Sequence, residues 1–248
     1  MAITKYNLYD SESAANCDAL CLAFLREALI PDWLGENGTV EPDEGNASWY
    51  VMTDSDGNTI AKLHNYAGAE GTNRATMFYV DSAHTVGFSN YNNIRYKTGY
   101  KTSKGAMIIM DRSSASTGTG SGILIFGKTN NGKLAMVLKD PNLYYNATGG
   151  YTNYAATAYG AVTGARDDDI SALTHGLTFG PNANTYGSEE SSGENQTVLC
   201  PTPTHSNPGE TSIIEGVFMM PWAQYRNEGK IQIGNKYYAS NGYWVLED

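Results

Sequence analysis

The most restrictive feature of this sequence is a series of short segments in which apolar residues alternate with others and which end at turns rich in Gly and Asn. The clearest pair is Ile123–Lys128 and Lys133–Leu138, two mainly apolar segments that flank Asn130-Asn131-Gly132. Two short apolar segments joined by a turn of Asn and Gly predict an antiparallel hairpin. We therefore expect a chain built mainly from antiparallel sheet.

Several other segments follow the same pattern. Asp54-Ser55-Asp56-Gly57 and Gly234-Asn235 are the expected turns of two further hairpins. The predicted strands are Trp49–Thr53 with Asn58–Leu63, Lys230–Ile233 with Lys236–Ala239, Met77–Asp81 with Val86–Phe88, a closing strand Tyr243–Leu246, and Ala106–Met110, which is apolar enough to be buried on both faces.

A single strong helix is predicted from Ser11 to Ile30. Its apolar residues recur at the spacing of an amphipathic helix, with Asp10 or Ser11 as the N-cap and Pro31 just beyond the last turn. Trp33 and Leu34 are expected to fold back onto the helix end. The predicted apolar stripe consists of Cys17, Leu20, Cys21, Phe24 and Ala28.

These elements predict an α+β fold of mainly antiparallel sheet, sandwich-like or barrel-like, with one N-terminal helix. Residues 1–140 are expected to hold the helix and the β core. Residues 141–211 are rich in Gly, Asn and Ser and predict a long irregular arm or insertion. Residues 212–248 are expected to complete the core sheet through their hairpin.

Composition excludes several classes of function. The formal net charge is −10, with charged residues at 17% and hydrophobic residues at 41% of the 248 positions. Direct nucleic-acid binding needs clustered Lys and Arg, which this sequence lacks. No segment approaches the roughly 20 apolar residues of a membrane span. The N-terminal residues predict no signal peptide, and three cysteines predict no disulfide framework.

Motifs that suggest chemistry have plainer explanations. Asp54-Ser55-Asp56-Gly57-Asn58 resembles the start of a calcium loop, but strands flank it, which favours a hairpin turn. Cys17 and Cys21 share the apolar stripe, so buried core thiols are favoured over a metal site. Gly118–Gly122 precedes a strand and fits neither a phosphate loop nor a nucleophile elbow.

The remaining polar groups give no catalytic or metal constellation. Asp167-Asp168-Asp169 is interpreted as a helix cap, because adjacent carboxylates do not face one another across a cleft. The four histidines, His64, His84, His175 and His205, have neither triad nor metal-ligand spacing. We therefore predict no catalytic residue, no metal and no cofactor, and a chain that is not an enzyme.

Aromatic residues crowd the C-terminal segment. Trp, Tyr and Arg are the residue types that dominate binding at protein interfaces, although Tyr also simply favours strands. Within each adjacent aromatic pair of a strand, one side chain should face inward and one outward. The candidate interface residues are Trp222, Tyr225, Arg226, Tyr238, Tyr243 and Trp244.

The same segment carries a family resemblance. The MPWxQYR-type link from Met220, the Gly-turn hairpin and the closing SNGYW strand are similar to the ends of structural proteins of tailed bacteriophages and prophages. The resemblance covers about the last thirty-five residues, to Asp248. It implies a virion structural protein, with tail or baseplate favoured over head (capsid) or connector.

On this resemblance we expect a homo-oligomeric subunit whose partners are copies of itself and other virion proteins. It would be assembled in the bacterial host cytoplasm. Two alternatives stay open: a glycan- or receptor-binding module whose exposed aromatic rings stack on host-surface sugars, and a wall-degrading enzyme. Residue patterns alone do not decide the position in the particle or the symmetry.

Overall fold

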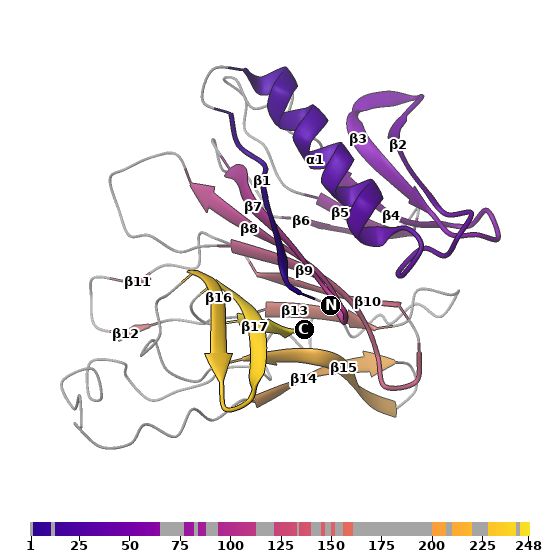
Figure 1. Cartoon of the computed structure of the whole chain (residues 1–248). Helices are drawn as coiled ribbons and strands as arrows, with labels where there is room; N and C mark the ends of the chain where they lie inside the picture. Colours follow the sequence, from indigo (N-terminus) through magenta and orange to yellow (C-terminus); the bar gives the residue numbers. More distant parts are fainter. Residues whose placement is uncertain are drawn as a thin grey trace.

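The part of the chain that the structure describes forms one helix and three large antiparallel sheets (Figure 1). This computed structural model describes residues 2–10, 13–64, 77–81, 84–87, 94–112, 122–132, 134–139, 145–146, 150–151, 156–160, 200–206, 210–219, 228–241 and 244–248. The predicted α+β class with mainly antiparallel sheet is confirmed. The large sheets are open and stacked, so the arrangement is sandwich-like and not a closed barrel.

The central sheet has six strands in the order β1-β7-β8-β9-β10-β13. Neighbouring strands are antiparallel, and the predicted pair Ile123–Lys128 with Lys133–Leu138 is confirmed as β9 and β10. The strands are β1 (Thr4–Asn7), β7 (Ile94–Thr102), β8 (Gly105–Arg112), β9 (Gly122–Lys128), β10 (Leu134–Lys139) and β13 (Ala156–Gly160).

The N-terminal sheet has five strands in chain order. The predicted hairpin across Asp54–Gly57 is confirmed as β3 and β4, and the predicted pairing of Met77–Asp81 is confirmed as β5 with β6. The strands are β2 (Thr39–Asp43), β3 (Asn46–Thr53), β4 (Thr59–His64), β5 (Met77–Asp81) and β6 (His84–Gly87).

The C-terminal sheet has five strands in the order β14-β15-β18-β17-β16. The predicted hairpin around Gly234-Asn235 is confirmed as β16 and β17. The strands are β14 (Cys200–Ser206), β15 (Glu210–Met219), β16 (Glu228–Ile233), β17 (Lys236–Asn241) and β18 (Trp244–Glu247), and a separate two-stranded piece joins β11 (Tyr145–Asn146) to β12 (Gly150–Tyr151).

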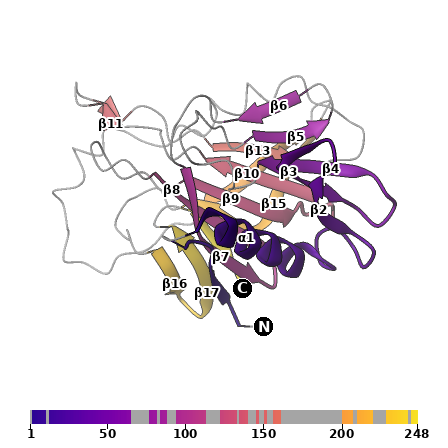
Figure 2. The same cartoon turned by 90° about the horizontal axis from the view of Figure 1, so that it is seen from above.

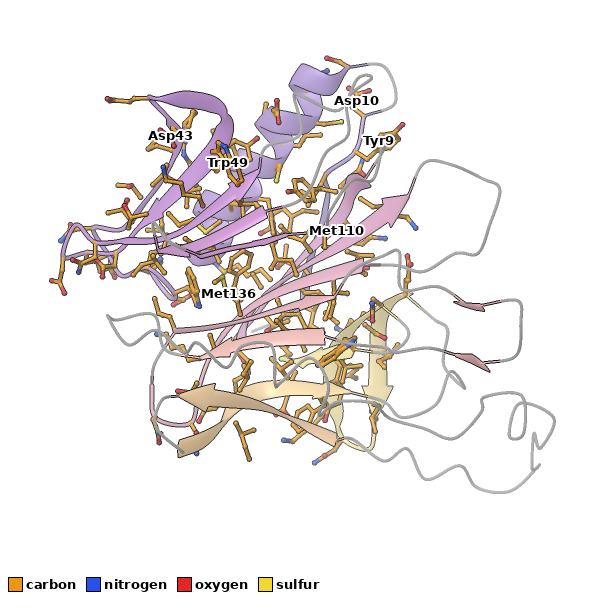
Figure 3. All side chains as sticks on the ribbon, turned by 180° about the vertical axis from the view of Figure 1, so that it is seen from behind. Tyr9, Asp10, Asp43, Trp49, Met110 and Met136 are labelled. Atoms are coloured by element: carbon orange, nitrogen blue, oxygen red, sulfur yellow. The ribbon has the colours of Figure 1, made fainter. Side chains whose placement is uncertain are left out.

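The central sheet lies between two hydrophobic cores (Figures 1 and 2). Strand β8 shows why: Ile108 and Met110 pack toward the helix and the N-terminal sheet, whereas Met107 and Ile109 pack toward the C-terminal sheet. Figure 3 labels Met110 together with Met136 of β10 in the first of these cores. The burial on both faces predicted for Ala106–Met110 is thus confirmed, because all five residues are fully buried.

Helix α1 (Ala14–Leu29) covers the central sheet on its N-terminal-sheet side. The amphipathic helix was predicted correctly, but its N-cap is Ser13, whose Oγ accepts a hydrogen bond from the Asn16 N–H at 3.2 Å. Leu20, which we placed on the apolar stripe, is 39% exposed. It lies at the border of the stripe, and Leu25 and Leu29 are buried on the opposite border.

The segment after the helix folds back as predicted, and Trp33 and Leu34 are buried. The Trp33 indole Nε1 donates a hydrogen bond of 2.7 Å to the Gly127 carbonyl at the end of β9. Just beyond, the Asn130 N–H donates to the Ile213 carbonyl at 2.9 Å, which links the β9–β10 turn to β15. The end of β9 therefore connects all three layers.

The C-terminal region differs from the predicted domain boundaries. Residues 212–248 do not complete the core sheet; with β14 they make a sheet of their own that packs on it. Two segments of the predicted arm, β13 and β14, are strands that extend the central and C-terminal sheets. Pairing with β10 and β15 gives these segments regular structure, although their sequences lack strong alternation. Residues 161–199 lie outside the described residues.

Candidate functional site

Two of the predicted interface residues are buried inside the chain. Trp244 is 1% exposed and Tyr238 is 3% exposed. Trp244 points from β18 into the core between the C-terminal and central sheets. Tyr238 packs with Val245, Phe218 and Ile231 on the opposite face of the C-terminal sheet. An interface role needs an accessible side chain, so this is a correction to the prediction for both residues.

Four other predicted interface residues, Trp222, Tyr225, Arg226 and Tyr243, lie outside the described residues. Asp167-Asp168-Asp169, His175 and residues 118–121 also lie outside the described residues, whereas Gly122 begins β9. His64, His84 and His205 lie in described strands, but their side chains are not described.

The exposed aromatic of the hairpin is Tyr237, which the sequence analysis did not select. Tyr237 is 44% exposed, whereas its neighbour Tyr238 is buried. The prediction that one member of an adjacent pair faces out is confirmed, but the choice of member was reversed. Tyr237 lies on the same face of β17 as Ala239, which packs toward the central sheet, but it is nearer the turn and stays exposed. Tyr238 is buried on the other face, beside Phe218 and Val245.

Lys230 stands over the Tyr237 ring. Its Nζ lies 4.5 Å from the ring centroid, and the two residues come from paired strands β16 and β17. A cation over an aromatic face is attracted by the ring quadrupole, by about 0.5–1 kcal/mol at an exposed site. The β16–β17 hairpin therefore presents one lysine and one aromatic ring side by side on an exposed surface.

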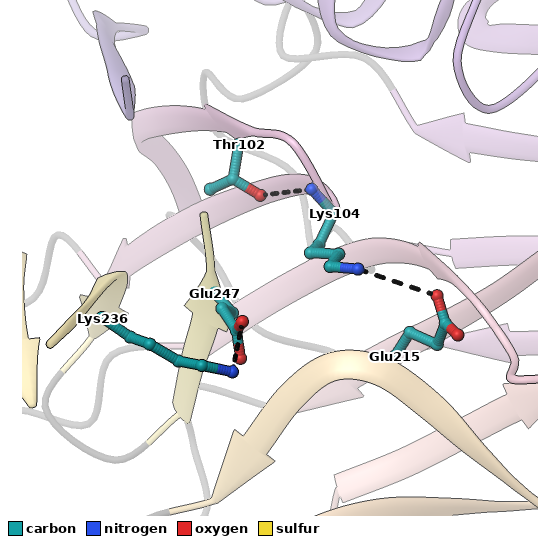
Figure 4. Close-up of polar contacts among 5 residues, drawn as sticks. All are labelled: Thr102, Lys104, Glu215, Lys236 and Glu247. Carbon is teal, nitrogen blue, oxygen red and sulfur yellow. Dashed lines mark hydrogen bonds and ion pairs between the residues drawn. The ribbon is translucent and has the colours of Figure 1, made fainter. Parts of the chain in front are cut away.

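Ion pairs fix the C-terminal sheet in place (Figure 4). Lys236 Nζ lies 2.7 Å from Glu247 Oε1, and Lys104 Nζ lies 4.0 Å from Glu215 Oε2. The hydrogen bond and charge of Glu247 raise the pKa of Lys236. At the base of the hairpin, Lys97 of β7 pairs with Glu228 at 3.0 Å. Exposed pairs of this kind contribute about 0–1 kcal/mol each, so their main effect is orientation.

The two helix cysteines are buried core residues, as predicted. Cys17 and Cys21 are both fully buried. Burial, followed by the nearby charges of Asp18 and Cys17, raises the pKa of the Cys21 thiol. The thiolate is the form that attacks or binds metal, so a raised pKa makes Cys21 a poor nucleophile and ligand. The Tyr50 hydroxyl, which donates to Asp18 Oδ1 at 2.9 Å, also has a raised pKa, mainly because of burial.

The Asp54 segment is a hairpin turn, as predicted, and not a calcium loop. Asp54 Oδ1 accepts hydrogen bonds from the backbone N–H groups of Asp56 at 3.0 Å and Asn58 at 2.8 Å. Its other oxygen accepts from the Asn58 side chain. Desolvation acts to raise the pKa of Asp54, but these bonds outweigh it and hold the pKa below its usual range. The carboxylate thus closes the turn itself.

The described part of the chain holds no group of three or more His, Cys, Asp or Glu residues that would bind a metal. It also offers no helix with the length and apolar character needed to cross a membrane. No protein-family model, no curated protein and no solved structure matches the chain. The exposed pair Lys230 and Tyr237 on the β16–β17 hairpin is the candidate functional site and is called the hairpin face below. Lys236 lies on the other face of β17, with Tyr238 and Glu247.

Proposed function

We propose that this chain is a structural subunit of a tailed-phage or prophage-derived particle and acts through protein–protein assembly. A place in the tail or baseplate is favoured over the head or connector. The phage identity rests on the similarity of the C-terminal segment to virion structural proteins. The assembly role rests on the exposed β16–β17 hairpin in that same segment.

The observation that carries the proposal is the exposed β16–β17 hairpin. It lies at the end of the C-terminal sheet, with β16 as the outermost strand in the described strand order. Residues along β16 alternate between exposed and half-buried. An edge strand presents backbone donors and acceptors to which another chain can pair, and exposed Tyr is enriched at interfaces. The hairpin therefore suits contact with another protein.

The hairpin is also held rigidly. Lys97–Glu228 and Lys236–Glu247 connect it to β7 and β18, and Ile231 and Ile233 pack beside Tyr238. A surface that is already ordered loses less conformational entropy when it binds. Such preorganisation favours a repeated contact between subunits.

The test combines two measurements on the full chain. Mass spectrometry of purified particles should detect the protein at a fixed copy ratio to the other virion proteins. Native mass spectrometry of the isolated protein should show discrete oligomers. A protein that is absent from every particle fraction and strictly monomeric would contradict the proposal, and specific capture on a glycan array would favour the carbohydrate-binding alternative.

A further inference from the structure

The hairpin face carries an exposed lysine within an acidic protein. Lys230 is exposed next to the exposed Tyr237 ring, whereas Lys236 lies on the opposite face of β17, beside Tyr238. Lys236 is paired with Glu247, whereas Lys230 is held over the ring of Tyr237 and leaves its charge available. With a formal net charge of −10, copies of this chain repel one another at long range. Local patches of opposite sign would offset this repulsion in a contact between copies.

A patch of opposite sign is formed by two neighbouring loops at residues 30–38 and 54–57. The Ser55 N–H donates to the Leu34 carbonyl at 3.0 Å, and the Asn37 N–H donates to Ser55 Oγ at 3.0 Å. The loops expose three carboxylates, which we call the acidic end: Asp32, Glu36 and Asp56.

The acidic end is rigid and has charge available for a partner. None of its three carboxylates forms an ion pair within the described residues. Trp33, which directly follows Asp32, is attached to the central sheet by its hydrogen bond to the Gly127 carbonyl. The loops are thus anchored on both sides, and the carboxylates are presented from a preorganised backbone.

The two patches lie at opposite sides of the molecule. Figures 1 and 2, seen along perpendicular directions, both place the β16–β17 hairpin on one side and the loops next to β2, β3 and β4 on the other. One chain cannot bring its own two patches together without taking the three layers apart. Complementary patches on opposite sides are the arrangement of a head-to-tail contact, which generates rings or filaments.

We propose that the hairpin face of one copy docks on the acidic end of the next copy. Lys230 meets the carboxylates of Glu36 and Asp56, and Tyr237 supplies the apolar contact area. This inference rests on the proposed assembly function and adds the partner, the two surfaces and the polarity of the contact. Because the attraction is between exposed charges, it weakens as salt shortens the screening length.

Two variants separate the surfaces. The hairpin variant carries Lys230→Ser and Tyr237→Ser, and the acidic-end variant carries Glu36→Lys and Asp56→Lys. At concentrations where the unchanged chain is oligomeric, each variant alone should be monomeric, with self-association weakened by about tenfold or more. Size-exclusion chromatography with light scattering, at low and high salt, measures this.

Mixing the two variants gives the decisive result. The acidic-end variant keeps its hairpin, and the hairpin variant keeps its acidic end, so one intact contact forms between them. Neither partner can extend the chain further, and a 1:1 heterodimer is expected in native mass spectrometry. A contact that used the same patch on both copies would give no heterodimer from this mixture.

Matched controls change the same kinds of residue elsewhere. Lys5→Ser with Leu20→Ser removes an exposed lysine and an exposed apolar side chain from β1 and α1. Glu44→Lys reverses an exposed carboxylate outside the acidic end that also forms no ion pair within the described residues. Both control variants should assemble like the unchanged chain, and circular dichroism should show that all four variants are folded.

Three outcomes would overturn the inference: variants that assemble normally, a mixture without heterodimer, or an unchanged chain that is monomeric at every concentration and salt. The detection of the protein in purified particles is measured separately. A protein present in particles whose hairpin and acidic-end variants still assemble disproves only the docking mode. A protein absent from particles argues against the proposed function whatever the docking result.

Discussion

Single residues in this protein are constrained by what lies against them, and Gly105 is the sharpest case. Gly105 begins β8 with a φ of 152°, a region that residues with side chains rarely adopt. A Cβ atom at this position would lie 2.0 Å from the Phe126 carbonyl oxygen on β9. Glycine is therefore required here for two reasons: the positive φ and the close approach of β9.

Gly105→Ala should destabilise the protein by at least about 2 kcal/mol, because the methyl group forces β8 and β9 apart. Urea denaturation followed by circular dichroism measures this loss. Gly57→Ala is the matched control, since Gly57 also has a positive φ, of 84°, but open space around it. The control should cost only about 1 kcal/mol. Equal losses in the two variants would show that the contact with β9 is unimportant.

Asp54 provides a pH-dependent test at the same scale. Its pKa is lower in the folded chain than in the unfolded chain, so its stabilising effect is fully present above the unfolded value of about 4 and is lost as the pH falls through the folded value. Asp54→Asn removes the charge. The unchanged chain should be more stable than this variant at pH 7, and the difference should shrink below about pH 4. A difference in denaturation midpoint that is constant from pH 7 to 3 would contradict this account.

At the scale of elements, local sequence predicted most hairpins, and long-range contacts set the details. The turns at Asp54–Gly57 and Gly234-Asn235 formed where predicted, because turn residues and alternation act over a few positions. The start of α1 was wrong by two to three residues, since Asp10, Ser11 and Ser13 are all good N-cap residues. Strand β13 was missed because its partner β10 lies some distance away in the sequence. Strand β14 was missed although its partner β15 comes next in the chain, because Pro201 and Pro203 lack the backbone donor that a strand interior needs.

The segment after α1 offers a prediction about one such long-range contact. Trp33→Phe keeps an aromatic ring against Phe126, whose ring centroid lies 5.2 Å from that of Trp33, but it removes the donor to Gly127. Removing this buried hydrogen bond should cost about 0.5–1.5 kcal/mol. Thermal or urea unfolding measures it, with Tyr237→Phe at an exposed position as the control that should change stability by less than about 0.5 kcal/mol. An unchanged stability in Trp33→Phe would mean that the bond contributes nothing.

At the scale of the whole molecule, the central sheet makes the three layers interdependent. Adjacent residues of β8 serve different cores: Met107 faces the C-terminal sheet and Ile108 faces the helix and the N-terminal sheet. The loss of either core would expose one face of the same sheet to water. The layers should therefore unfold together.

Met107→Ala and Ile108→Ala test this coupling. Each truncation leaves a cavity in one core and should cost about 2–5 kcal/mol. We expect each variant to shift the entire transition, with tryptophan fluorescence and far-UV circular dichroism giving the same midpoint. If Met107→Ala produced a separate early transition while Ile108→Ala did not, the C-terminal sheet would be an independent unit.

The sequence by itself determined the α+β class, the helix, most hairpins and the buried state of Cys17 and Cys21, because these depend on patterns within about twenty residues. Only the tertiary structure decided which member of the pair Tyr237 and Tyr238 is exposed. Alternation requires the two side chains to face opposite sides of β17, but the sequence pattern does not tell which side of the strand is covered. Tyr238 is buried because Phe218 of β15 and Val245 of β18 pack beside it on the side of the sheet that faces away from the central sheet. Tyr237 shares the other side with Ala239, but it lies nearer the turn and stays exposed.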